Sequence, residues 1–148
     1  MLLVRTRLDL SQIDGIGLFA DQFIRKDTII WRFNPVFDLR FLEGELESLS
    51  QEALEQITKY SYRERSSGLY VLCGDDARFF NHSPDPNCVD VCCGSDGDIT
   101  RAKSDIEPGI ELTSDYSLFD LDMIEGRYSI PSRKPAPPPG SHTPILSV

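Results

Sequence analysis

The segment Arg78-Phe-Phe-Asn-His-Ser-Pro-Asp-Pro-Asn87 is the most unusual stretch of this sequence. Two aromatic residues lead into a polar cluster of Asn81, His82, Ser83 and Asn87, which two prolines interrupt. Asn and His side chains donate and accept hydrogen bonds, so such a loop either satisfies itself through Asx turns or binds a polar ligand. No Ser and Asp pattern accompanies His82, which argues against a hydrolase triad.

Two other segments are poorly explained by packing alone. Gly15-Ile16-Gly17 lets the backbone approach a ligand closely, although an ordinary turn has the same pattern. It is not a dinucleotide-binding motif, because no third glycine follows at the required offset. Glu111-Leu-Thr-Ser-Asp-Tyr116 ends in a tyrosine that is either a half-buried aromatic residue or a phenol directed into a site.

Outside these segments, short runs of β-branched and aromatic residues separated by turns predict strands. The expected strands cover residues 2–4, 28–33, 69–73, 87–92, 98–103 and 110–113, and residues 15–20 are expected to be a glycine turn entering a further strand. One helix is expected over residues 46–58, with Ser48 and Gln51 as its capping box. Its apolar stripe, expected to face the core, is Leu46, Leu49, Ala53 and Ile57. This order of elements predicts a mainly β fold of the α+β type with one main helix.

Taken together, the three segments resemble the SET-domain protein lysine methyltransferases. That family has a glycine pair before Leu/Phe-Ala, then Arg-Phe-x-Asn-His-Ser-Cys-x-Pro-Asn, and then Glu-Leu-Thr-aromatic-Asp-Tyr. This chain has Gly15-Ile-Gly-Leu-Phe-Ala20 and the two longer segments in the same order. The likeness covers residues 3 to 120 and implies a β-clip-like fold of small curved sheets, in which the last two motifs form a knot-like arrangement.

The resemblance also implies a function, which is methyl transfer from S-adenosyl-L-methionine to the lysine ε-amine of a basic protein. Tyr116 matches the tyrosine of the methyl-transfer channel and is the expected catalytic residue. Ser114 would line that channel beside it. The residues implied for cofactor binding are Asp14, Gly15, Ile16, Gly17, Tyr60, Tyr62, Asn81, His82, Tyr116 and Phe119. A catalytically weak SET module that binds a basic peptide is the alternative.

Two departures from the family pattern matter. Pro84 replaces the cysteine that helps many members bind zinc, and no cysteine follows Tyr116, so no metal is expected. The lysine channel would then be closed by residues 119–128, by the C-terminal tail or by a partner chain, for example in a homodimer. Ser114 replaces an aromatic residue, which leaves more room and favours higher methylation states.

The chain has 148 residues and a net charge of −9, which fits one domain. The acidity argues against direct nucleic-acid binding and against anionic membranes, and it favours a basic partner. Residues 95–125 concentrate it, with nine acids against Arg101 and Lys103. A solvated face is one interpretation of these acids, and a docking surface for a lysine-bearing peptide is the other.

The remaining features concern the cysteines, the tail and the cell compartment. Cys73, Cys88, Cys92 and Cys93 are too few and too crowded for a disulfide framework, and free thiols are favoured over a metal site. No signal peptide or membrane span is evident, so we expect an intracellular protein. The SET domain is expected to cover residues 1–130, followed by a Pro-rich tail over 131–148 that is either passive or a ligand for another domain.

Overall fold

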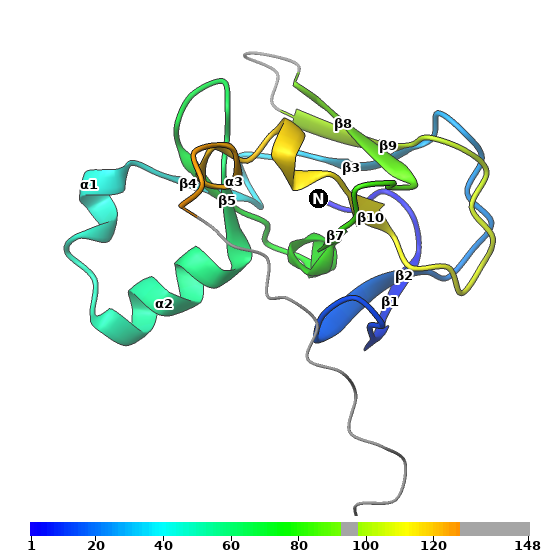
Figure 1. Ribbon diagram of the computed structural model, residues 1–148, viewed down its shortest axis with the longest axis horizontal. Helices are drawn as coiled ribbons and strands as arrows, with labels where there is room; N and C mark the ends of the chain where they lie inside the picture. Colours follow the sequence, from blue (N-terminus) through cyan, green and yellow to red (C-terminus); the bar gives the residue numbers. More distant parts are fainter. Residues whose placement is uncertain (93–97, 128–148) are drawn as a thin grey trace, which may run out of the picture.

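The protein folds into several small β-sheets with few helices, as the sequence predicts (Figure 1). The computed structural model describes residues 1–92 and 98–127. The strands are β1 (Thr6–Leu10), β2 (Ile16–Ala20), β3 (Ile29–Arg32), β4 (Leu39–Phe41), β5 (Ser61–Arg63), β6 (Tyr70–Leu72), β7 (Asn81–His82), β8 (Cys88–Cys92), β9 (Asp98–Ala102) and β10 (Thr113–Ser114). The helices are α1 (Glu43–Leu46), α2 (Gln51–Tyr60) and α3 (Leu121–Ile124), with 3-10 turns η1 (Asp76–Phe79) and η3 (Tyr116–Leu118). Cys93 and the predicted tail lie outside the described residues.

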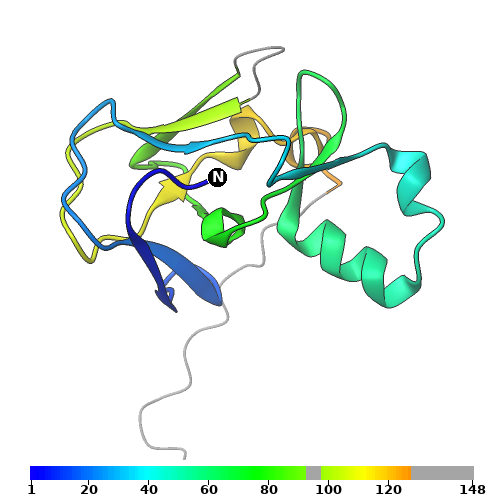
Figure 2. The same ribbon diagram turned by 180° about the vertical axis from the view of Figure 1, so that it is seen from behind.

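Four sheets form from these strands, and each has only two or three members. β1 and β2 make an antiparallel hairpin, β4-β6-β5 and β3-β9-β8 are antiparallel, and β7 pairs with β10 in parallel. The hairpin and the β3-β9-β8 sheet lie on either side of η1 and the β7–β10 pair in both views (Figures 1 and 2). The short motif strands therefore run through the middle of the molecule.

The hydrophobic core lies between the hairpin and the β3-β9-β8 sheet. Its fully buried members are Leu18, Ala20, Ile24, Ile30, Cys88, Ala102, Ile106 and Leu112. Alternate residues of a strand share one face, so the side of β8 and β9 that carries Cys88 and Ala102 also carries Asp90 and Thr100. One sheet face is thus apolar at one end and polar at the other.

The predicted helix over 46–58 differs from the structure in two respects. The chain forms two helices, because it leaves the helical path at Ser48 to Ser50, where Ser48 Oγ donates to the main-chain oxygen of Glu45. Ser50, and not Ser48, caps α2 by accepting a hydrogen bond from Ala53 N at 3.3 Å. Residues of α2 are half-buried or exposed, so α2 does not face the core and instead projects from the sheets (Figure 1).

Three further local features concern a turn, the cysteines and the helices. The turn at Glu107-Pro-Gly109 has Gly109 at φ +87° and closes with a hydrogen bond from Ile110 N to Glu107 O at 3.3 Å. Cys73 and Cys88 are buried free thiols, and burial raises the pKa of Cys88 to about 12. No helix in the described ranges is long and apolar enough to cross a membrane.

Candidate active site

The second and third sequence motifs lie side by side in the fold. β7 pairs with β10 so that Asn81 lies opposite Thr113, and the pairing continues over the next residue of each strand. The Asn87 side chain ties the other end, because its Nδ2 donates to Glu111 O at 2.8 Å and its Oδ1 accepts from Thr113 N at 3.0 Å. This cross-linking forms the knot-like arrangement that the sequence predicts.

The first motif joins this arrangement through Asn81. Asn81 Nδ2 lies 3.1 Å from the main-chain oxygen of Asp14, 3.3 Å from that of Ile16 and 2.8 Å from Glu111 Oε1. A Cβ atom at Gly17 would lie 2.2 Å from Glu111 Oε1, so only glycine allows this close approach without a shift of Glu111. Asn81 and Glu111 therefore fix the loop before β2 against the knot.

Tyr116 follows directly after the knot and is held at both ends. Its main-chain nitrogen donates to His82 Nδ1 at 3.1 Å, so the ring proton of His82 lies on Nε2. Its hydroxyl donates to the main-chain oxygen of Phe80. Because that proton is committed, the oxygen lone pairs of Tyr116 are the part of the hydroxyl that can act on a ligand.

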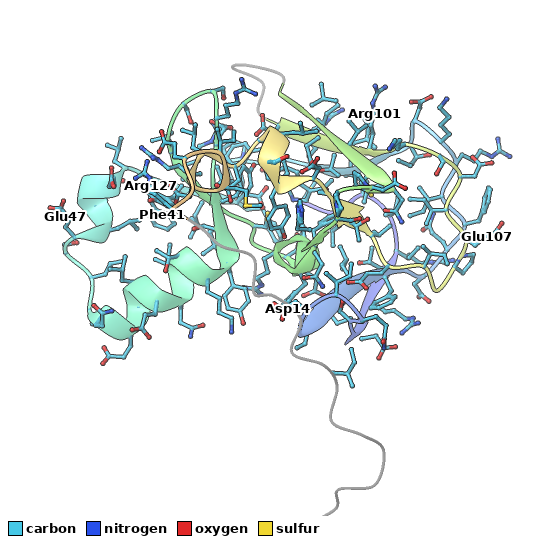
Figure 3. All side chains as sticks on the ribbon, in the orientation of Figure 1. Asp14, Phe41, Glu47, Arg101, Glu107 and Arg127 are labelled. Atoms are coloured by element: carbon cyan, nitrogen blue, oxygen red, sulfur yellow. The ribbon has the colours of Figure 1, made fainter. Side chains whose placement is uncertain are left out.

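One cleft of about 810 Å³ brings the sequence-predicted site residues together. The predicted residues that line it are Asp14, Gly15, Ile16, Tyr60, Tyr62, Asn81, His82, Ser114, Tyr116 and Phe119. Gly17 does not line the cleft. Its backbone instead lies close to the Glu111 side chain. Figure 3 places the labelled Asp14 at the end of the β1–β2 hairpin, at the lower rim of the molecule.

Aromatic rings form one wall of this cleft. Phe119 contacts Tyr62 and Tyr116 edge to face, with ring centroids 5.2 and 5.5 Å apart, and Tyr60 packs against Phe79 in the same way at 5.6 Å. Burial and nearby acidic groups raise the pKa of Tyr62 well above its usual value, so its phenol stays protonated. The wall is therefore apolar in surface and uncharged.

The floor of the cleft contains acidic residues that the sequence analysis did not single out. Asp90, Asp98 and Thr100 of the β8–β9 pair all line the cleft. Burial raises the pKa of Asp90 to about 6, although hydrogen bonds from Thr100 and Ser114 act in the opposite direction. A signal for Asp90 was present, because it alternates in phase with the buried Cys88 within an otherwise apolar strand.

A second, smaller cleft of about 420 Å³ meets the first at this floor. Both clefts are lined by Asp90, Asp98 and Phe119. The smaller cleft otherwise belongs to the segment Glu64 to Ser66, Val91 and Leu118. The two clefts therefore converge on the same three side chains.

Several acids of the stretch 95–125 have partners within the protein. Glu111 accepts from Ser11 Oγ at 2.7 Å, and Asp120 caps α3 and accepts from Arg63 N at 3.2 Å. Asp122 and Glu125 both pair with Arg63, at 3.5 and 3.3 Å. A fully solvated face is therefore the wrong description for much of this stretch, while Asp96 lies outside the described residues.

The comparisons with known proteins agree with this geometry. The SET domain family matches residues 15–117. The Drosophila melanogaster protein named histone-lysine N-methyltransferase trr is 30% identical in an alignment of 127 positions that covers 76% of this chain but only 5% of that protein. The Plasmodium falciparum protein PFL0690c has a similar solved structure, with TM-score 0.55, 19% identity, and coverage of 78% of this chain and 95% of that one. A Chaetomium thermophilum Polycomb Repressive Complex 2 structure aligns with TM-score 0.61 and 20% identity, over 82% of this chain and 16% of that chain.

Proposed function

The chain belongs to the SET domain family, and on that premise we propose that it transfers a methyl group from S-adenosyl-L-methionine to the ε-amine of a lysine in a basic protein. One observation carries the proposal: ten residues that the family resemblance implies for the site line one cleft, and a second cleft shares three lining residues with it. Methyl transfer between two large ligands requires two such approaches to one point. Histone-like substrates are proposed by analogy with the name of the fly relative.

The residues of the larger cleft fit this cofactor. Trp31 Nε1 and Ser61 Oγ are buried and have no hydrogen-bond partner among the described residues, and both side chains line the cleft. Unsatisfied buried polar atoms are rare in folded proteins, so a polar ligand is the natural partner for them. The loop from Asp14 to Ile16 would hold the methionine end, and Phe119 offers an apolar ring for the adenine.

When bound, S-adenosylmethionine supplies a methyl group on a sulfonium, which is already a good leaving group. The protein then has to bring the amine into line with that methyl, and such positioning provides most of the achievable acceleration. The hydroxyl oxygen of Tyr116 would orient the amine. Its proton is donated to the main-chain oxygen of Phe80, so its lone pairs can accept a hydrogen bond from an N–H of the amine. The rings of Tyr62 and Phe119 would border the path of the amine on one side.

Calorimetry and a transfer assay test the proposal separately. We expect S-adenosylmethionine to bind, and radiolabelled methyl to appear on core histones or on a library of lysine-centred peptides. Tyr116→Phe should lower the rate about 10²-fold, which is the scale of one preorganised electrostatic contact. Tyr70→Phe is the comparison within the same cleft, since it removes a phenol oxygen that bonds Asp122 of α3, and it should lower the rate much less than Tyr116→Phe.

The outcomes separate the two function classes. Binding of both cofactor and basic peptide without any transfer would favour a binding module over an enzyme. Failure to bind S-adenosylmethionine at millimolar concentration would overturn the proposal altogether.

A further inference from the structure

Asp90 lies where the linings of the two clefts overlap. It lies on the inward face of β8, two residues along from the buried Cys88, and pairs across the sheet with Thr100, which in turn pairs with Trp31 of β3. Asp90 lines the larger cleft and the smaller one. Its carboxylate is thus placed where a group entering through the smaller cleft would meet the cofactor side.

The surroundings of Asp90 contain hydroxyls and other acids. Thr100 Oγ1 donates to Asp90 Oδ1 at 2.5 Å, and the Ser114 hydroxyl also bonds the carboxyl group. The charged neighbours that act on it are Asp98 and Asp115, which both repel its negative charge. Among the ion pairs of residues 1–92 and 98–127, none includes Asp90.

A buried acid among other acids is costly unless a cation joins it. Burial and like charge raise the pKa of Asp90 to about 6, so the carboxyl is mostly ionised at neutral pH although no cation of the described residues pairs with it. Buried groups with such shifts concentrate at functional sites, because they bind or exchange protons with a ligand. A ligand cation such as an ammonium group would compensate this charge.

Resting on the proposed function, we propose that Asp90 is the catalytic base that binds the substrate lysine ammonium and removes its proton before methyl transfer. In the first step, one N–H bond of R–NH₃⁺ breaks and an O–H bond forms on Asp90, which leaves a neutral amine and a neutral carboxylic acid. The amine lone pair then forms the N–C bond to the methyl. The C–S bond breaks with its electron pair remaining on sulfur, and a methylated ammonium is produced.

This step solves the protonation problem of lysine methylation. A free lysine amine has a pKa near 10.4, so it is almost entirely protonated at pH 7 and cannot attack. In a dry channel, an ammonium and a carboxylate are both destabilised relative to their neutral forms, which favours proton transfer between them. Asp98 supports the base by like charge, while its own Oδ2 accepts from the phenol of Tyr62 at 3.4 Å.

Asp90→Asn tests the proposal, because it keeps the shape and the capacity to accept from Thr100 but cannot take a proton. We expect the rate of transfer to the peptides methylated by the wild type to fall about 10²- to 10⁴-fold, the range of general base catalysis. The affinity for S-adenosylmethionine should stay within twofold. Asp21→Asn is the matched control, since this exposed acid lines neither cleft and should leave the rate unchanged.

The pH dependence distinguishes a base from a merely structural acid. In the wild type, kcat/KM should fall below about pH 6, where Asp90 becomes protonated. In Asp90→Asn, this acidic limb should vanish, and the rate should instead rise about tenfold per pH unit towards pH 9 as free amine appears. The other titratable groups facing Asp90 are Asp98 on β9, Asp115 after β10, Tyr62 on β5 and Cys88 on β8, and His82 on β7 lies beside Asp115.

A second substrate keeps the test independent of the fold of the variant. Replacing the target lysine by aminoethylcysteine lowers the pKa of the amine, so the difference in transfer rate between wild type and Asp90→Asn should narrow.

If Asp90→Asn does not fold, the pH profile of the wild type still decides. The absence of a fall in kcat/KM at acidic pH, between pH 5 and 7, would overturn the role of Asp90. Equal rates for Asp90→Asn and Asp21→Asn, with an active wild type, would also overturn it and leave the proposed function intact. An inactive wild type would overturn the proposed function and the role of Asp90 with it.

Discussion

Two polar clusters lie close together in this fold, one half-buried and the other more deeply buried, and they are satisfied in opposite ways. In the Asn81 cluster, defined by Asn81, Asn87, Ser11 and Glu111, donors meet acceptors and the single carboxylate accepts from two side chains. In the Asp90 cluster, defined by Asp90, Asp98, Thr100 and Ser114, two acids share one wall of a cleft. The first cluster closes the knot, whereas the second holds an excess of negative charge at the point where two clefts meet.

This difference separates a polar cluster that stabilises the fold, the Asn81 cluster, from one that is suited to bind a ligand, the Asp90 cluster. A satisfied network stabilises, and damage to it should lower the free energy of unfolding. An acid held at a raised pKa lowers stability, and its removal should increase the free energy of unfolding while activity is lost. If damage to the Asn81 cluster lowers the free energy of unfolding and removal of the Asp90 carboxylate raises it, the two clusters have different roles. Changes of the same sign would contradict this assignment.

The largest expected effect is on the Asn81 cluster. Asn81→Asp replaces the donor to Glu111 by a second carboxylate 2.8 Å away and leaves the oxygens of Asp14 and Ile16 without their donor. We expect the free energy of unfolding to fall by about 4 kcal/mol, the scale of a broken buried charge arrangement. Urea denaturation at pH 7 measures it.

The control for this variant is Gln22→Glu, which makes the same amide-to-carboxylate change but keeps the oxygen that accepts from Arg5 N at 2.9 Å. It should shift the free energy of unfolding by less than about 0.5 kcal/mol. Equal losses for the two variants would mean that the Asn81 cluster contributes no special stability.

The next effect has the opposite sign and concerns Asp90. Its folded pKa of about 6 lies above the unfolded value of 3.8, so from pH 4 to pH 6 the folded protein retains a proton that the unfolded chain loses. Stability of the wild type therefore falls as pH rises through this window, by about 3 kcal/mol at pH 7 for a shift of that size. Asp90→Asn lacks this penalty and should be more stable at pH 7, with the difference vanishing near pH 4.

Denaturation at pH 4.5, 5.5 and 7.0 measures this difference, with Asp21→Asn as a variant of the same charge that should show no such trend. A variant Asp90→Asn that is less stable than the wild type at pH 7 would place Asp90 with the Asn81 cluster as a structural group.

Ser114 links the two clusters and carries a smaller effect. It lies opposite His82 in the knot, and its hydroxyl bonds Asp90. Ser114→Ala removes only this hydroxyl and should lower the transfer rate about tenfold, in line with a hydrogen bond to a charged group. Ser114→Phe also fills the channel and should shift the products towards fewer methyl groups.

Mass spectrometry of the methylated peptide separates these two consequences. Ser114→Ala should keep the product distribution of the wild type, because it leaves the channel as wide. Unchanged products in Ser114→Phe would show that this position does not set the methylation state.

The sequence could predict the parts that depend on local motifs. The glycine loop, the Asn-His-Ser segment and the Tyr116 segment follow each other in an order that predicts the family, and their residues meet in one cleft. The break between α1 and α2 was missed because Leu46 and Ala53 share a helical spacing even though Ser48 to Ser50 leave the helix. The alternation of Asp90 with Cys88 marks it as a polar residue on an apolar strand face, but its role depends on the cross-strand partners, and local periodicity does not determine strand order.

The smallest expected effect concerns the acids outside both clusters. The clustering of acids in residues 95–125 predicts that transfer to a basic peptide weakens as salt rises, because exposed charges are screened over about 10 Å at 0.1 M salt. However, Asp122 and Glu125 already pair with arginines, and Glu107 lies at the opposite edge of the molecule from Arg127 (Figure 3). We therefore expect kcat/KM to fall only about threefold between 0.05 and 0.5 M NaCl, consistent with weak surface pairs. The rate at saturating peptide should not change, since the bound lysine would then cover the half-buried Asp90 and shield it from salt. A thirtyfold loss of kcat/KM would show instead that exposed acids govern docking, and a salt-dependent saturated rate would show that the Asp90 cluster is open to solvent.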